Sequence, residues 1–496
     1  TGRGFAGSKT LQGAGLIVAQ HPPDDVGIVV PDDVVYLLVA DTAVAAAWLS
    51  AAWYGFPSRE LVMIGVTGTD GKTTTVNILH TILRAAGLQA GILSTLRAVI
   101  GDKEEPLALH VTTPEAPVIQ RYLRQMVNAG MTHCVLETTS HGLAQHRVTA
   151  VDFDIAVVTN ITHEHLDYHH TWDAYAAAKK QLFDLVANKQ APATKKPAAI
   201  PQTLILNKDD AASFALLSPI QAPSVFTYSI ENKEATLFAD NMVLNPWSTQ
   251  YRLHINTQQA AQVEIETGMF GLFNVSNMLA AAAAATALGV SPAEIQMGLR
   301  KMGGVYGRMQ PINKGQSFLV LVDFAHTPNG LEKAIDAARR TLNQAHGSGR
   351  VITVFGSAGK RDPEKRRMMA EISARDADLT VLTAEDPRTE SLADILDAMA
   401  AGCRHQGGVE GQTFWRIPDR GQAIYFALSL AEKNDLVIVC GKGHEQSMCF
   451  ITTEYPWNDV HAAETALDAF LAKRPMPNLG LPTFDENFYV SIDKRS

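Results

Sequence analysis

A glycine-rich turn between an apolar run and a helical pattern, at residues 61–75, constrains the fold of this chain most. The apolar run LVMIGV is followed by GTDGKTTT and then at once by the helical pattern VNILHTILRAAG. This order predicts a strand, a glycine loop and a helix. Such a loop directs backbone N–H groups at an anion on the helix N-terminus, and adds a lysine ammonium for a terminal phosphate and a hydroxyl for the accompanying magnesium. The stretch therefore predicts an ATP site.

The glycine spacing departs from the strict phosphate-loop pattern G-x-x-x-x-G-K-[ST]. The glycine that precedes the loop is Gly65, and position 66 is a valine. An ordinary strand-to-helix turn with a chance lysine is the alternative. That alternative requires the strand, both loop glycines, Lys72 and the threonine run to coincide by accident, so the phosphate-loop interpretation is preferred.

Composition bounds the number of domains and the kind of partner. The 496 residues are 46% hydrophobic and 19% charged, which allows large cores and predicts about three domains. A net charge of -9 leaves no basic field to attract nucleic acid or anionic lipid.

The apolar stretches are too short to span a bilayer, and the start of the chain does not resemble a signal peptide. The four cysteines show no C-x-x-C pairing and suit a reducing compartment. We expect a soluble, cytoplasmic monomer that binds neither nucleic acid nor membrane.

Apolar segments alternate with helical segments from residue 61 onward, which predicts an α/β fold with parallel sheets covered on both faces. A more polar region, residues 224–268, predicts antiparallel strands added to the first sheet, and a strongly helical segment follows it. Ahead of this, GLIVAQ and VGIVV are predicted strands and DTAVAAAWLSAAWYGF a helix. The pattern restarts near residue 308. We therefore predict a small N-terminal module (1–59), a central ATP-binding domain (60–307) and a C-terminal Rossmann-like domain (308–496).

Polar residues gather where predicted strands end, which is where open parallel sheets bind ligands. Glu137 ends one apolar run, and its carboxylate would suit Mg²⁺; a surface glutamate is the alternative. Residues 159–170 contain four histidines. Because neither H-E-x-x-H nor a paired Cys/His spacing is present, one histidine assisting magnesium is preferred to a zinc site. Lys179 and Lys180 follow in a helical pattern and read, from the residues alone, as solvated lysines.

The second sheet has its own polar strand ends. Asp323 and His326 could meet a ribose or a phosphate, and the basic run 360–367 is interpreted with equal weight as a ligand contact or as a solvated helix start. Arg388 offers a guanidinium suited to bidentate carboxylate capture, and GKGHE at 441–445 offers backbone N–H groups and an acid. An arginine and an acid on separate strand ends could grip a zwitterion, which indicates an amino acid substrate.

Taken in order, these strings resemble the Mur ligase family, and most closely its members that add the third residue of the peptidoglycan stem peptide. The likeness covers roughly residues 5–470. The matching strings are GTDGKTT (68–74), TTP (112–114), ETTSHGLAQHRV (137–148), TNITHEHLDYH (159–169), AAK (177–179), FNVSN (273–277), GRM (307–309), DFAHTPNG (323–330), EDPR (385–388) and GKGHE (441–445).

The resemblance implies a UDP-binding N-terminal module, a central ATPase domain and a C-terminal domain for the incoming amino acid. It implies ATP and Mg²⁺, with Thr73 and Glu137 ligating one ion and His165 helping to hold a second. Lys179 falls where the family carries a carbamylated lysine, which replaces the solvated interpretation. Lys72, Glu137, His165 and Lys179 become the catalytic set.

The resemblance also assigns the binding residues. For the nucleotide these are Gly68, Thr69, Asp70, Gly71, Lys72, Thr73, Thr74, Asn274, Asn277, Arg308 and Asp323. For the UDP-muramoyl-dipeptide they are Thr112, Thr113, Ser140, Gln145 and Arg147. For the amino acid they are Arg366, Asp386, Arg388, Gly441 and Glu445. The implied reaction forms an acyl phosphate on the dipeptide carboxylate, which the amine of the new amino acid then attacks.

Two departures from the family pattern leave questions open. Diaminopimelate-adding members usually read Asp-Asn-Pro-Arg where this chain has Glu385-Asp386-Pro387-Arg388. Arg388 favours diaminopimelate over lysine, but the Asp386 carboxylate adds a charge expected to repel a substrate carboxylate. Family members also carry further residues ahead of Gly4 that grip the uridine diphosphate, so we expect a truncated sequence or altered UDP binding. A Mur-like ligase for another acceptor and a catalytically silent nucleotide-binding protein are the alternative functions.

Overall fold

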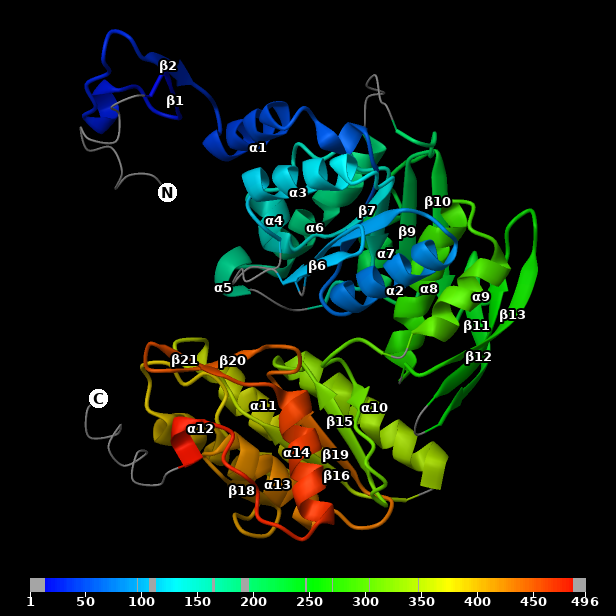
Figure 1. Ribbon diagram of the computed structural model, residues 1–496, viewed down its shortest axis with the longest axis vertical. Coiled ribbons are helices and arrows are strands. Elements are labelled where there is room, and N and C mark those ends of the chain that lie inside the picture. The colour runs from blue at the N-terminus through cyan, green and yellow to red at the C-terminus, as the bar shows by residue number, and fades with distance from the viewer. Residues whose placement is uncertain are drawn as a thin grey trace. The chain divides into compact units, whose positions relative to one another are not determined.

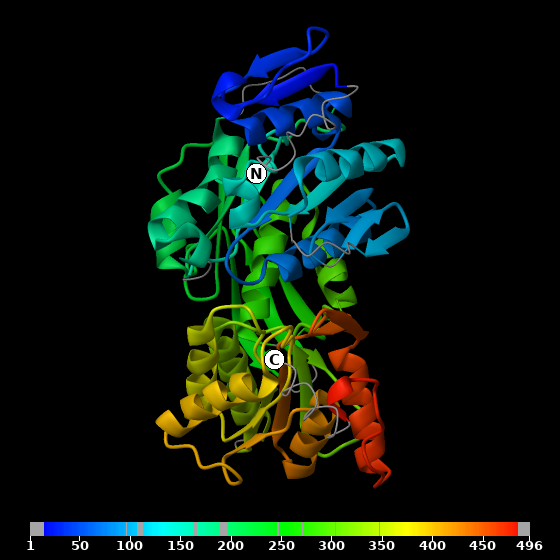
Figure 2. The same ribbon diagram turned by 90° about the vertical axis from the view of Figure 1, so that its left-hand side faces the viewer.

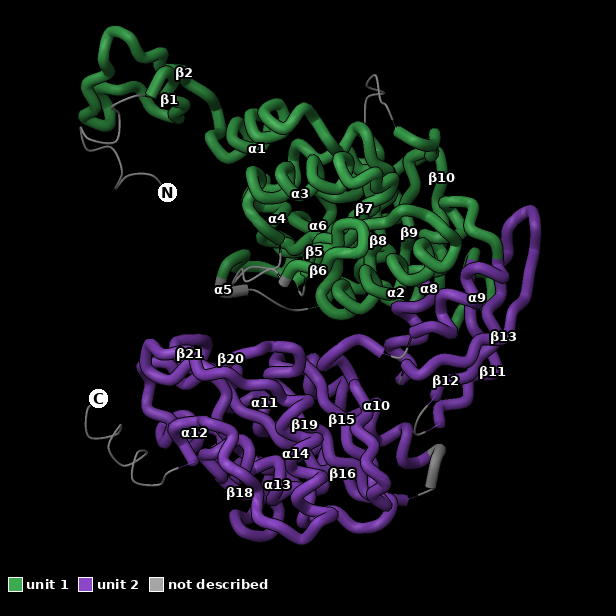
Figure 3. The backbone as a smooth tube through the Cα atoms, viewed as in Figure 1, with its two compact units in different colours: residues 1–236, 280–291 green, residues 237–279, 292–496 purple. Residues whose placement is uncertain are grey.

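The computed structural model describes the chain in two compact units, residues 1–236 with 280–291 and residues 237–279 with 292–496 (Figure 3). The residues described are 14–95, 97–106, 113–162, 166–188, 196–245, 248–269, 271–302, 304–346 and 348–484.

The N-terminal module contains a small parallel sheet. Strand β1 (Leu16–Ala19) pairs with β2 (Val35–Leu38), and helix α1 (Thr42–Trp53) follows, capped by the Asp41 carboxylate. The helix confirms its prediction, but the strand predicted over VGIVV is wrong. A short 3-10 helix, Asp24–Val26, ends there at Gly27 with φ 65°, a left-handed conformation that turns the chain.

The large sheet of the first unit has the strand order β10-β9-β8-β3-β7-β4-β5-β6. From β10 to β4 the neighbours are parallel, and β5 and β6 form an antiparallel hairpin at the edge. The strands are β3 (Val62–Thr67), β4 (Ala90–Leu93), β5 (Arg97–Ile100), β6 (Lys103–Pro106), β7 (His133–Glu137), β8 (Ile155–Val158), β9 (Thr203–Asn207) and β10 (Ser224–Ser229). The helices are α2 (Lys72–Ala85), α3 (Ala116–Asn128), α4 (Ser140–Ala144), α5 (Leu166–His169), α6 (Trp172–Ala187) and α7 (Ala211–Leu217).

Helices cover both faces of this sheet (Figure 1), because its central strands are apolar on both sides. Alternate residues such as Leu61 and Met63 form one core with α3, α6 and α7, and α2 packs against β3, β4 and β7. Gly65 belongs to this packing. A Cβ at this position would lie 2.6 Å from Leu182 Cδ1 on α6, so this glycine permits close approach of helix and strand and is no part of the phosphate loop.

The second unit begins with an antiparallel meander of β11 (Leu237–Leu244), β12 (Thr249–Ile255) and β13 (Ala261–Thr267). Helix α9 (Pro292–Lys301) packs on β13, and the unit boundary falls within α8 (Leu272–Ala287). The predicted antiparallel region is therefore correct only from Leu237, since Ser224–Ser229 pairs in parallel with β9.

The C-terminal sheet has the order β14-β15-β19-β16-β17-β18, parallel except for the short β14. Figure 2 shows α11 and α12, in yellow, on one side and α14, in red, on the other. The strands are β14 (Gln310–Pro311), β15 (Leu319–Asp323), β16 (Val351–Phe355), β17 (Leu379–Leu382), β18 (Phe414–Arg416) and β19 (Leu436–Cys440), with a hairpin of β20 (Ser447–Phe450) and β21 (Thr453–Pro456). The helices are α10 (Pro328–His346), α11 (Pro363–Asp376), α12 (Leu392–His405), α13 (Arg420–Leu430) and α14 (Asp459–Leu471).

These parts confirm the predicted α/β class, with a small N-terminal sheet, a central mixed sheet and a C-terminal parallel sheet. The boundaries after residues 59 and 307 stay predictions. In the part of the chain that the structure describes, no helix is both long and apolar enough to cross a membrane.

Candidate active site

The glycine loop connects β3 to α2 and depends on two glycines. Gly68 has φ 151° and Gly71 has φ 82°, both in the region that side chains disfavour. A Cβ at Gly68 would also lie 1.8 Å from Thr159 Oγ1. No other residue fits at position 68, because the loop passes directly over the end of β8.

Backbone contacts anchor the start of the loop to the end of β8. The Thr69 N–H donates to Asn160 O at 2.8 Å, and the Asp70 N–H donates to Asn160 Oδ1 at 3.0 Å. The Thr159 hydroxyl donates to Asp70 O at 2.6 Å. The loop N–H groups of Thr69 and Asp70 are therefore engaged within the protein. The first turn of α2, which begins at Lys72, supplies the N–H groups without helical partners that can face a phosphate.

A buried carboxylate lies beside this helix start. Glu137 is 1% exposed, which excludes the surface-glutamate interpretation. Its Oε1 accepts from the Thr73 hydroxyl at 2.8 Å, and its Oε2 accepts from the Thr95 N–H and hydroxyl at 2.9 and 3.1 Å. A hydroxyl and a carboxylate are hard oxygen donors, so Thr73 and Glu137 fit Mg²⁺. His165 lies outside the described residues, and its role stays a prediction.

Lys179 and Lys180 have different environments. Lys180 is half-buried and its Nζ donates to Asp184 Oδ1 at 2.6 Å, as expected of a solvated lysine. Lys179 is 1% exposed, so the solvated interpretation from the residues alone is wrong. Its Nζ donates to Gly68 O at 2.5 Å and lies 4.5 Å from the centre of the Tyr175 ring. The structure thus brings Lys179 to the glycine loop, where the resemblance implies it.

The residues predicted to hold the dipeptide substrate lie close together near the end of β7. Thr113 Oγ1 donates to Glu137 O at 3.1 Å. The Arg147 guanidinium donates to Thr113 O and to Gln145 Oε1, each at 2.6 Å. Ser140 is buried, and its hydroxyl has no hydrogen-bond partner among the residues that the structure describes, so it is suited to bind a ligand. Thr112 lies outside the described residues.

In the second unit, Arg308 and Asp323, which are both predicted to bind the nucleotide, lie near each other. Asp323 Oδ2 accepts from the Met309 N–H at 2.7 Å, and Oδ1 accepts from the Ala325 N–H at 2.8 Å. Burial raises the pKa of Asp323, although Arg308 opposes the shift. The Arg308 guanidinium lies 4.3 Å from the centre of the Phe324 ring.

The two asparagines predicted to bind on the adenine side form a pair of their own on α8. Asn277 Nδ2 donates to Asn274 Oδ1 at 3.2 Å, and both side chains are buried.

The predicted amino acid site contains an unexpected ion pair. Asp386 Oδ1 accepts from Lys442 Nζ at 2.9 Å and from the Cys449 N–H at 3.0 Å. Lys442 also pairs with Glu445. Burial lowers the pKa of Lys442, but Glu445 and Asp386 outweigh it and raise the pKa above its ordinary value. The charge that Asp386 adds is therefore matched by Lys442. This pairing weakens the repulsion expected between Asp386 and a substrate carboxylate. The guanidinium of the half-buried Arg388 lies 4.0 Å from the other oxygen of Asp386, Oδ2.

Arg366 is held by another acid. Its Nη1 and Nη2 donate to the two carboxylate oxygens of Glu390 at 2.5 and 2.7 Å, and the side chain is 4% exposed. The hydrogen bonds from Arg366 hold the pKa of Glu390 at about 2. This bidentate pair ties α11 to the segment after β17, and it occupies the guanidinium edge that would grip a carboxylate.

Sequence reasoning missed several residues that the structure brings to the sites. Three of them contact the glycine loop or Glu137: Thr95, Asn160 and Tyr175. Of these, only Asn160 could have been found from the sequence, because it stands at the end of an apolar strand. Glu385 is buried beside Gly441, where a Cβ would lie 2.8 Å from Glu385 Oε2. Within the described part of the chain this oxygen has no hydrogen-bond partner, and burial raises the pKa of Glu385 to about 7.

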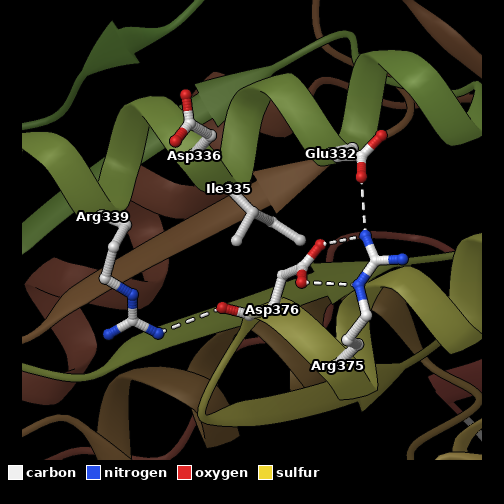
Figure 4. A pocket seen from close by; sticks show the side chains of 6 residues that line it. All are labelled: Glu332, Ile335, Asp336, Arg339, Arg375 and Asp376. Carbon is white, nitrogen blue, oxygen red and sulfur yellow. Dashed lines mark hydrogen bonds and ion pairs between the residues drawn. The ribbon is translucent and has the colours of Figure 1, made fainter.

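A surface pocket in the second unit lies apart from the predicted site residues. It has a volume of about 510 Å³ and lies between α10 and α11 (Figure 4). Its charges are already paired: Arg375 donates to Glu332 and Asp376, and Arg339 donates to the Asp376 carbonyl. None of the predicted site residues lines it.

The parallel sheets and the glycine loop at a helix start place this chain among the α/β enzymes that bind nucleoside phosphates. Comparison with known families makes this specific. Residues 66–285 match the Mur ligase middle domain, and residues 307–443 match the Mur ligase glutamate ligase domain. The chain belongs to the Mur ligase family, and it is thus an ATP-dependent ligase of the acid–amino-acid class.

Individual relatives cover nearly the whole chain. The UDP-N-acetylmuramoyl-L-alanyl-D-glutamate--2,6-diaminopimelate ligase of Geobacillus kaustophilus is 38% identical over 444 residues, which cover 90% of this chain and 85% of that protein. The UDP-N-acetylmuramyl-tripeptide synthetase of Deinococcus radiodurans is 40% identical over 465 residues, covering 93% and 87%. A solved structure of a UDP-N-acetylmuramoyl-L-alanyl-D-glutamate--2,6-diaminopimelate ligase matches with a TM-score of 0.61 and 28% identity, covering 95% and 90%.

Proposed function

We propose that this chain adds meso-diaminopimelate to UDP-N-acetylmuramoyl-L-Ala-D-Glu, with cleavage of ATP to ADP and phosphate, in the synthesis of the peptidoglycan precursor. The observation that carries the proposal is the convergence of Lys72, Glu137 and Lys179 on one glycine loop, in a chain 38% identical to a diaminopimelate ligase. Its partners are small-molecule substrates, and we place the reaction in the cytoplasm, with a monomer as the working unit.

In the proposed reaction, the terminal carboxylate of the dipeptide attacks the γ-phosphorus of ATP. The bond from this phosphorus to the ADP oxygen breaks, so ADP leaves and an acyl phosphate remains. The start of α2 and the ammonium of Lys72 face the charge that develops on the phosphoryl oxygens. Thr73 and Glu137 would hold Mg²⁺, which neutralises phosphate charge when bound. The amine of the amino acid then attacks the acyl carbon, and inorganic phosphate leaves as the amide forms.

We propose that residues of the segment after β17 select the amino acid substrate. Diaminopimelate differs from lysine by a second carboxylate, and Arg388 is the half-buried cation beside the pair of Asp386 and Lys442. A guanidinium can take that carboxylate in bidentate fashion. Lys179 is proposed to act as its carbamate, since a buried amine at the loop gains a carboxylate-like end in that form.

Phosphate release with UDP-muramoyl-dipeptide and meso-diaminopimelate, L-lysine or L-ornithine tests the proposal. We expect turnover with meso-diaminopimelate and at least tenfold less with the other two. Lys72→Ala should abolish it, whereas Lys180→Ala, which removes a solvated lysine, should retain it. Equal turnover in Lys72→Ala, or turnover only with a different acceptor, would contradict the proposal.

A further inference from the structure

Tyr175 has no role in the reaction as described, yet it contacts two parts of the phosphate site. It lies on α6, one turn before Lys179, and its side chain is fully buried. Its hydroxyl lies 2.9 Å from Thr69 Oγ1, and its ring face lies 4.5 Å from Lys179 Nζ. One side chain therefore touches both the glycine loop and the buried lysine.

The contact with Thr69 fixes the loop from a second direction. The Thr162 N–H donates to Thr69 Oγ1 at 2.9 Å, and the Thr69 N–H donates to Asn160 O at 2.8 Å. These bonds come from the segment after β8, whereas Tyr175 comes from α6. A loop held from both sides is ordered before a ligand arrives, which lowers the entropic cost of binding.

The contact with Lys179 acts on the other end of the loop. Residues four apart lie on one helix face, so the Tyr175 ring packs against the end of the Lys179 side chain, 4.5 Å from Nζ. Lys179 Nζ donates to Gly68 O at 2.5 Å. A carbamylated lysine keeps one N–H on this nitrogen, so the bond to Gly68 O is available in the form that is proposed to act in the reaction.

We propose that Tyr175 is a positioning residue of the phosphate site. Its hydroxyl fixes Thr69 and its ring packs against the end of the Lys179 side chain, and together these contacts hold the loop in its binding conformation before the nucleotide arrives. The inference rests on the proposed function, in which this loop binds the phosphates of ATP.

Calorimetric binding of Mg-ADP to the full chain tests the inference. Tyr175→Phe keeps the ring and loses the hydroxyl, so the dissociation constant should rise about fivefold, as for one lost hydrogen bond. Tyr175→Leu loses both contacts, and the constant should rise further. Tyr251→Phe is the matched control, because Tyr251 is also buried but its hydroxyl donates to Met278 Sδ, at 3.6 Å, and contacts no residue of the glycine loop that the structure describes. It should bind within twofold of the wild type.

Acetylation by acetic anhydride in bicarbonate-free buffer, in which Lys179 carries no carbamate, is read by mass spectrometry and reports separately on the lysine. Lys179 should be protected in the wild type and in Tyr175→Phe, and labelled at least fivefold faster in Tyr175→Leu. Thr69→Val removes the contact between the Tyr175 and Thr69 hydroxyls from the side of Thr69. The double variant Thr69→Val with Tyr175→Phe should bind Mg-ADP no more weakly than Thr69→Val alone, since both changes remove the same bond.

The outcomes separate this inference from the proposed function. If Lys72→Ala binds Mg-ADP as tightly as the wild type, the assignment of the loop fails. If Lys72→Ala weakens binding but Tyr175→Phe stays within twofold of the wild type, only the inference fails. Additive effects in the double variant, or equal labelling of Lys179 in the leucine and phenylalanine variants, also overturn it.

Discussion

At the residue scale, the carboxylate of Glu137, proposed to be catalytic, is oriented by the groups that hold it. Glu137 is a sequence-level candidate because it ends an apolar strand, but its orientation comes from Thr73 on one oxygen and from Thr95 on the other. Thr95 follows β4, a different strand. A fixed carboxylate presents one geometry to a metal, which favours Mg²⁺ with its demand for near-octahedral ligands.

Removal of the Thr95 hydroxyl should weaken the metal site. In Thr95→Val the N–H bond to Glu137 remains and the 3.1 Å hydroxyl bond is lost. Loss of one hydrogen bond to a charged group is worth roughly 1.5–3 kcal/mol. We expect the Mg²⁺ concentration for half-maximal activity, and the Mn²⁺ dissociation constant by electron paramagnetic resonance, to rise about tenfold or more. Thr95→Ser should restore both, and unchanged Mn²⁺ binding in the valine variant would contradict the role.

Glu385 should make stability depend on pH. Its pKa in the folded protein is about 7, raised by burial from 4.5, so the folded state holds the proton more tightly than the unfolded state. The stability it contributes is full below about pH 4.5 and is lost as the pH rises through 7. Relative to the wild type, Glu385→Gln should gain free energy of unfolding as the pH rises from 5 to 8, by at most roughly 3 kcal/mol, and melting temperatures across this pH range measure it. The same substitution at the exposed Glu234 should show no such trend. If the difference in stability between Glu385→Gln and the wild type does not change with pH, the pKa of Glu385 is not raised.

At the scale of elements, the site is assembled where strands of the central sheet end. The loop after β3, Glu137 at the end of β7 and Asn160 after β8 lie on adjacent parallel strands, whose carboxyl ends share one edge of the sheet. Helix α6 then brings Lys179 and Tyr175 under the loop. Each element is predictable alone, while the contacts depend on strand order.

The loop conformation can be tested by comparing two glycines. Gly68 and Gly87 both have positive φ, but a Cβ meets Thr159 Oγ1 at 1.8 Å in the first case and nothing within 4 Å in the second. Gly87→Ala should cost about 1 kcal/mol of stability by backbone strain alone and keep nucleotide binding. Gly68→Ala should abolish binding, measured by calorimetry with Mg-ADP. Binding retained by Gly68→Ala would show that the loop tolerates displacement.

At the scale of the whole molecule, each large unit has a separate core, and the second is fixed by a buried ion pair. Arg420 at the start of α13 and Asp459 at the start of α14 are both fully buried and bonded at 2.7 Å. Asp459 also accepts from the Gly443 N–H at 3.1 Å and from the Trp457 indole at 2.8 Å. The pair thus connects two helices to the GKGHE loop predicted to bind the amino acid.

Breaking this pair should destabilise the second unit. Arg420→Met leaves the Asp459 carboxylate buried without its cation, which costs about 3–5 kcal/mol. Arg252→Met breaks the exposed pair with Glu264 and should cost less than about 1 kcal/mol. Urea unfolding measures both. If the two variants lose equal free energy of unfolding, burial does not determine how much each ion pair contributes.

The sequence by itself determined the α/β class, the order of strand, loop and helix, and which polar residues stand at the strand ends. These follow from local patterns, because hydrophobic periodicity and glycine placement act over a few residues. The tertiary structure alone decided that Gly65 serves packing, that Asn160 engages the Thr69 and Asp70 N–H groups, that Lys179 is buried and Lys180 is not, and that Arg366 belongs to Glu390. Burial and pairing depend on partners tens of residues away, whose approach is set by strand order and helix packing rather than by neighbours in the chain.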